Sequence, residues 1–114
     1  MKIDDIDIYH LPKWLERIFE GVESLCHETL KKESEAYRKI LNETYDLLER
    51  HRVISTIVDG DKINEPMELS VEEAKALSRF CHLESGRKEL EAIQIYLIGA
   101  KHMWELMELL KLTK

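Results

Sequence analysis

Apolar residues recur at helical spacing along most of the chain, and the first stripe of them follows directly after a proline. From Leu11 to Thr29 the apolar positions are three and four residues apart, as on one face of an α-helix. Pro12 suits the first turn of such a helix, because its ring fixes φ near the helical value and its missing N–H has no role there. We therefore expect a helix to start near Pro12.

A second apolar stripe covers residues 37–58 and stops before Gly60, which can take the left-handed conformation that ends a helix. No strong helix breaker separates the two stripes, so the pattern also permits one helix over residues 12–58. That helix would be roughly 70 Å long, about twice the diameter of a compact domain of this size. The sequence therefore favours a turn near Glu33 or Ser34. The alternative is an elongated molecule whose apolar stripe needs a partner.

A capping box in the stretch LSVEEA marks the next helix start. Ser70 can cap the helix while the Glu73 carboxylate reaches back to the Ser70 amide. We expect this helix to end at Gly86 and a last helix to cover residues 87–112. The last helix is apolar on two adjacent faces, which is typical of a helix that is central or shared with another subunit.

These patterns predict an all-α fold, a compact bundle of about four helices arranged as two helical hairpins, with a short extended N-terminal arm. A length of 114 residues fits a single helical domain, residues 1–114. The longest mostly apolar run, residues 92–100, is about half the length needed to cross a bilayer. The first ten residues carry three aspartates where a secretory signal needs a basic start. We therefore expect a cytoplasmic protein without membrane contact.

The chain is acidic, with a net charge of −6 from 23 acidic and 17 basic residues. This charge opposes direct binding to nucleic acid, because phosphate contacts need an excess of Lys and Arg. On the first predicted helix, Glu16, Glu20 and Glu23 share the side opposite the apolar stripe. We predict that this acidic face contacts a protein or ribonucleoprotein partner.

Both cysteines are followed directly by a histidine, at Cys26-His27 and at Cys81-His82. Adjacent residues of a helix point about 100° apart, so neither pair can easily bind one metal ion. We expect both thiols to be reduced and to lie on apolar stripes, with the histidines at the edge. The sequence thus favours two buried thiols over a zinc site or a cysteine nucleophile.

A sharper metal candidate is a run of carboxylates and one histidine at helical spacing: Glu16, Glu20, Glu23 and His27. His102 and Glu105 add a second pair. Helical di-iron proteins carry Glu-x-x-His motifs whose side chains point into the bundle. In the second pair here the order is reversed, because His102 precedes Glu105, and the three glutamates of the first run lie on the polar side of their helix. A solvated acidic face is favoured, and a carboxylate-histidine metalloprotein is the alternative. We predict no catalytic residue, no metal and no cofactor, and the chain has no Gly-rich phosphate loop and no His-Glu-x-x-His motif.

Four large apolar residues can anchor a protein interface: Trp14, Trp104, Met103 and Met107. The competing interpretation places them in the core; it is favoured for Trp104 and evenly balanced for Trp14. The sequence also allows a purely structural homodimer. Its last helices would pair through Leu97, Ala100 and Trp104.

The chain closes with ELEAIQIYLIGAKHMWELMEL after the helix that Ser70 opens. This stretch has an acidic start, an aromatic, a glycine three residues later and a bulky apolar end, at Glu91, Tyr96, Gly99 and Leu106. In these features the last third resembles small all-helical proteins of phages and mobile elements of Gram-positive bacteria. The resemblance implies no catalytic residue and a class rich in inhibitors of host machinery, including anti-CRISPR proteins. We therefore predict a non-enzymatic acidic binding protein that recognises, and can inhibit, a host protein or ribonucleoprotein such as a CRISPR nuclease.

Overall fold

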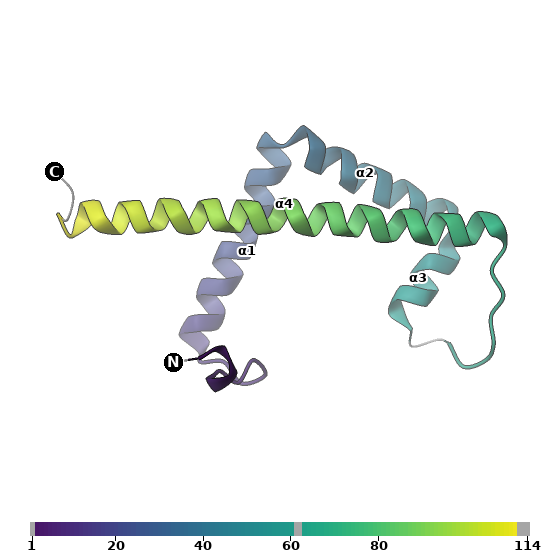
Figure 1. The fold of residues 1–114 in the computed structure, drawn as a ribbon, viewed down its shortest axis with the longest axis horizontal. Coiled ribbons are helices and arrows are strands. Elements are labelled where there is room, and N and C mark those ends of the chain that lie inside the picture. The colour runs from purple at the N-terminus through teal and green to yellow at the C-terminus, as the bar shows by residue number, and fades with distance from the viewer. Residues whose placement is uncertain (1, 61–62, 112–114) are drawn as a thin grey trace.

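Four α-helices make up most of the computed structural model, which describes residues 2–60 and 63–111 (Figure 1). Their bounds are α1 (Lys13–Glu33), α2 (Glu35–Arg50), α3 (Arg52–Asp59) and α4 (Val71–Leu109), preceded by a short 3₁₀ helix at Ile3–Asp5. The described residues contain no β-strand. The prediction of an all-α fold with about four helices is confirmed.

The turn between α1 and α2 is made by one residue, Ser34. Its amide donates to the Leu30 carbonyl at 2.9 Å and ends α1. Its side chain accepts a hydrogen bond from the Tyr37 amide at 3.0 Å and starts α2. Serine is well suited to this cap position, because its hydroxyl replaces a missing backbone acceptor. The predicted turn near Glu33 or Ser34 is therefore confirmed, in a stretch without Gly or Pro.

The second apolar stripe is divided between two helices, which corrects the expectation of one helix up to residue 58. His51, with φ −128° and ψ 77°, ends α2 and precedes α3. The bend turns Ile54 inward, where its side chain is fully buried. α3 ends as predicted at Gly60, which adopts the left-handed conformation with φ 70°.

α4 is one continuous helix of 39 residues, and it begins with the predicted capping box. The Glu73 amide donates to Ser70 Oγ at 3.1 Å, and the Ser70 amide donates to the Glu73 carboxylate at 3.0 Å. The predicted helix end at Gly86 is wrong, because α4 continues through this residue. Gly86 instead lets α2 approach closely, since a Cβ there would lie 3.3 Å from Ile40 Cδ1.

The molecule measures 62 × 35 × 19 Å, and its longest dimension follows α4 (Figure 1). α1 crosses α4 near the middle of that helix, and α2 and α3 lie along its N-terminal half. The largest group of buried side chains lies at this crossing: Cys26, Leu30, Tyr37 and Ile98. Two segments leave the crossing and carry apolar faces that it does not cover: the α1 arm (residues 13–23) and the α4 arm (residues 93–110), which includes Ile98 at the crossing itself.

The N-terminal segment folds beside the start of α1. After the 3₁₀ helix, a turn is closed by the His10 amide, which donates to the Asp7 carbonyl at 3.1 Å. Ile6 and Leu11 then line a hollow together with Trp14. Among the described helices, including the long α4, none combines the length and the apolar character needed to cross a membrane.

Candidate functional site

A network of charged side chains joins α1 to α4 where the two helices cross. Glu91 is only 9% exposed, and Arg87, one turn earlier on α4, donates to both of its carboxylate oxygens. His27 of α1 places its Nε2 atom 3.2 Å from the same carboxylate. Arg87 also donates to Glu84 at 2.7 Å. The sequence analysis missed this network, although the spacing of three and four residues between Glu84, Arg87 and Glu91 is the signal that could have revealed it.

The charges of this network are held in place by their neighbours. The hydrogen bonds from Arg87 lower the pKa of the Glu84 carboxyl, because they favour its ionised form. The bonds to Glu84 in turn raise the pKa of Arg87, whose guanidinium stays charged. General acid-base catalysis needs a group that exchanges its proton near the working pH. The Arg87–Glu84 pair, which lies within α4, is therefore suited to holding charge beside Glu91 rather than to transferring a proton.

Cys26 lies beside the network as a protonated thiol. Its side chain is buried, and its Sγ atom donates to the Glu91 carbonyl at 3.5 Å. Burial raises the pKa of this thiol, and the carboxylates of Glu91 and Glu23 raise it further. Because the thiolate is the nucleophilic form, this environment disfavours a reactive cysteine. The prediction of a buried thiol is confirmed for Cys26.

Cys81 lies exposed on α4, so the prediction of burial is wrong for this residue. The apolar stripe of α4 passes from Phe80 to the buried Leu83 and leaves Cys81 on the outer side. Ten residues of one helix, about 15 Å, separate Cys81 from the Glu91 carbonyl that Cys26 contacts. The two cysteines therefore lie too far apart to share a metal ion.

The predicted acidic face is present, because Glu16, Glu20 and Glu23 are all exposed on α1. Only Glu23 of the three lines a pocket together with His27, whose ring is turned toward Glu91. Within residues 2–60 and 63–111, no group of three or more His, Cys, Asp and Glu side chains could hold a metal ion. The structure therefore does not assemble the first carboxylate-histidine site that the sequence suggested.

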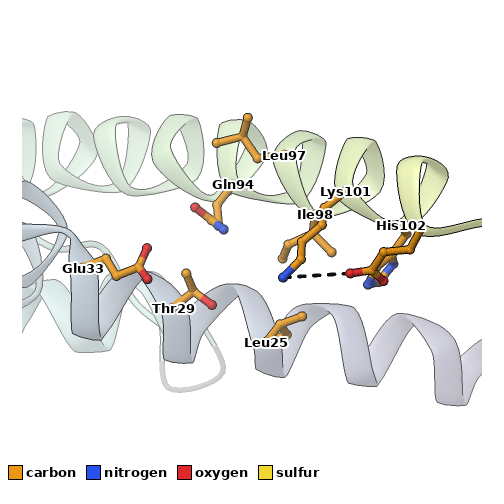
Figure 2. A pocket seen from close by; sticks show the side chains of 9 residues that line it. Leu25, Thr29, Glu33, Gln94, Leu97, Ile98, Lys101 and His102 are labelled. Carbon is orange, nitrogen blue, oxygen red and sulfur yellow. Dashed lines mark ion pairs between the residues drawn. The ribbon is translucent and has the colours of Figure 1, made fainter. Parts of the chain in front are cut away.

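The second predicted pair, His102 and Glu105, borders a groove of about 340 Å³ between α1 and α4 (Figure 2). Glu105 is paired there with Lys101, at 4.0 Å. The carboxylate that α1 contributes to the lining of this groove, Glu33, lies at the opposite end from His102. Leu25 and Thr29 line the groove between them. The groove is thus not built as a metal centre.

Exposed apolar side chains are prominent on both arms. On the α1 arm, Trp14, Ile18 and Phe19 are each more than half exposed. The α4 arm exposes Ile93, Ile95, Tyr96, Leu97, Met103, Trp104, Leu106, Leu109 and Leu110. Met107 is half-buried. Exposed apolar surface of this extent marks interaction sites in soluble proteins.

The predicted anchors therefore lie on these surfaces. The expectation that Trp104 belongs to the core is wrong, because its side chain is 54% exposed. Trp14, for which the sequence left both interpretations open, is 64% exposed. The physical reason is the position of the crossing. α1 packs against α4 at Ile98, and the described part of the chain does not cover the outer face of α4 beyond it.

A family model described as a family of unknown function, DUF6664, matches residues 6–113 of the chain. The match runs from the segment before α1 to beyond the end of α4. No curated protein and no solved structure gives a significant match.

Proposed function

This chain belongs to the DUF6664 family, whose function is unknown, and we propose that it is a non-enzymatic binding protein for a protein or ribonucleoprotein partner. The α1 arm is the surface that recognises this partner. The observation that carries the proposal is the exposure of Trp14, Ile18 and Phe19 beside the carboxylates of the acidic face. Large side chains of this kind dominate the energy of protein interfaces when they enter a pocket on the partner.

The charge around these anchors indicates the chemistry of the partner. Between residues 2 and 23 the chain carries six carboxylates and three basic side chains. A complementary partner therefore presents an apolar cleft with a basic rim. The acidic groups speed its association and make binding sensitive to salt, whereas the apolar anchors provide most of the affinity.

A ribonucleoprotein nuclease is a partner of this kind, because the channel that holds its nucleic acid is basic. The resemblance of the last third to phage and mobile-element proteins supports a CRISPR nuclease as the first candidate. Binding of the acidic face at such a channel would inhibit the nuclease by competing with nucleic acid.

The test is affinity capture from the lysate of a Gram-positive bacterium with CRISPR systems, followed by nuclease assays with the captured partner. One variant replaces Glu16, Glu20 and Glu23 with Gln, and another combines Trp14→Ala with Phe19→Ala. The control changes three exposed glutamates elsewhere: Glu49, Glu68 and Glu72 to Gln. We expect wild type and control to retain and inhibit the same partner, and both α1 variants to lose it. Equal retention by all four proteins would contradict the proposal.

A further inference from the structure

The outer face of the α4 arm repeats with the seven-residue period of a coiled coil. Spacings of three and four residues alternate along it, through Ile93, Tyr96, Ala100, Met103, Met107 and Leu110. All six are exposed except Met107, which is half-buried. Apolar residues at this spacing form the seam along which one helix packs against another. The occupant of this face is therefore an α-helix.

Charged side chains are absent from this seam and from its flanks within the α4 arm. The flanking positions, counted with the residue on either side of the arm, hold Ala92, Leu97, Gly99, Trp104 and Leu106, and the charged Lys111 follows at the end. The charged side chains of the arm and its histidine lie on the remaining positions: Lys101, His102, Glu105 and Glu108. A matching partner helix must be equally broad and equally free of charge. The α4 arm of a second copy has this composition.

The solvent-exposed area of the chain supports a partner that covers the α4 arm in concentrated protein. It exposes 9825 Å², whereas a folded monomer of 13.5 kDa exposes about 6,500 Å². Each subunit of a permanent dimer buries roughly 1,000–2,500 Å² of its own surface. The area that the chain exposes beyond that of a compact monomer is therefore large enough for a dimer interface and for the partner of the α1 arm. The described chain buries seven apolar residues. A second copy of the chain can cover the exposed apolar surface of the α4 arm without any other protein.

We propose that the α4 arm pairs with the α4 arm of a second copy as an antiparallel coiled coil. In this orientation Ile93 packs against Leu110 of the second copy, and Ala100 packs against its Met103. The smallest side chain of the seam thus faces a long one, which fills the interface evenly. A parallel pair would set Ala100 against Ala100 and leave a gap beside a crowded Met103 layer. Antiparallel pairing also opposes the two helix dipoles favourably. The proposal is independent of the proposed function, because the α1 arm stays free.

Sedimentation velocity over a dilution series tests the dimer. We expect wild type to have the mass of a dimer that dissociates on dilution. Met103→Glu places a charge in the apolar seam and should raise the dissociation constant about 100-fold or more. The control is Leu109→Glu, also on α4 and highly exposed but outside the seam, which should leave the constant unchanged. A wild type that is monomeric throughout, or a dimer that Met103→Glu does not weaken, would overturn the proposal. Circular dichroism verifies that each variant is helical.

Disulfide formation tests the orientation. In a Cys81→Ser background, which removes the exposed native thiol, one preparation carries Ala100→Cys and another carries Met103→Cys. Mixing the two should give a disulfide-linked dimer, because only the antiparallel pair brings these positions together. Neither preparation should cross-link efficiently alone. Rapid cross-linking of the Ala100→Cys preparation by itself would show a parallel pair and overturn the antiparallel arrangement. Neither experiment involves the partner of the α1 arm, so a failure here is distinct from a failure of the proposed function.

Discussion

His27 of α1 lies 3.2 Å from Glu91 of α4, although 64 residues separate them in the chain. The contact joins the two longest helices at their crossing, and Arg87 holds the other side of the same carboxylate. The position of this crossing decides what the rest of both helices can do. On leaving it, each helix continues as an arm with several large apolar side chains exposed.

Removal of Glu91 should weaken the crossing more than removal of a surface ion pair. Glu91→Ala leaves Arg87 without one of its two carboxylates in a largely buried site, and should lower the free energy of unfolding by about 2 kcal/mol. Glu43→Ala, which breaks the more exposed pair with Arg79, should cost less than about 1 kcal/mol. Urea unfolding followed by circular dichroism measures both. Equal losses would contradict a special role for Glu91.

The stability of the protein should depend on pH through Glu84. Its pKa in the folded state lies below the ordinary value of 4.5, because Arg87 donates two hydrogen bonds to it. A lowered folded pKa adds stability above the unfolded pKa, and this contribution disappears as the pH falls through the folded pKa. Wild type should therefore exceed Glu84→Gln in unfolding free energy at pH 7, and the difference should shrink progressively below about pH 4.5. A difference that is the same at pH 7 and pH 3 would argue against the pairing.

The two cysteines should differ sharply in reactivity. Cys81 is exposed, whereas Cys26 is buried and its thiol has a raised pKa. A maleimide applied to the native protein at neutral pH should therefore label Cys81 first and Cys26 only after unfolding. Peptide mass spectrometry identifies the labelled residue. Comparable native labelling of both residues would contradict the burial of Cys26.

The cap at the start of α4 should contribute measurably to stability. Ser70→Ala removes the hydroxyl that accepts from the Glu73 amide and should lower the free energy of unfolding by about 1 kcal/mol. Ser78→Ala, at an exposed site inside the same helix, should be neutral or slightly stabilising, because alanine is the better helix former there. Thermal unfolding compares the two variants. A smaller loss for Ser70→Ala than for Ser78→Ala would show that the cap does not contribute.

Local signals explain which parts of the fold could be predicted from the sequence. Ser70 with Glu73, and Gly60 after an apolar stripe, each carry their own hydrogen-bonding or conformational reason for a helix boundary. Gly86 misled the prediction, because a glycine inside a helix costs only about 1 kcal/mol and α4 has good helix formers on both sides. The bend at His51 has no such signal, since it depends on how Ile54 packs in the folded molecule.

The candidate surfaces were harder to predict, because exposure depends on where α1 crosses α4. Trp104 has the helical spacing of a core residue. Spacing along one helix does not show whether another helix of the same chain packs against that residue. The predicted burial of Cys81 was wrong for a related reason, since Leu83 rather than Cys81 continues the buried stripe of α4. The acidic face of α1 was predicted correctly as exposed, because three glutamates opposite an apolar stripe have no other place to lie.

Acrylamide quenching of single-tryptophan variants tests the central claim, that the α1 arm is free to bind a partner while the α4 arm pairs with a second copy. Trp104→Phe leaves Trp14 as the fluorophore, and Trp14→Phe leaves Trp104. We predict that Trp14 is readily quenched at every protein concentration, whereas Trp104 is shielded in concentrated protein and becomes accessible on dilution. A Trp14 that is shielded in the isolated protein, or a Trp104 that is equally accessible at all concentrations, would contradict the account.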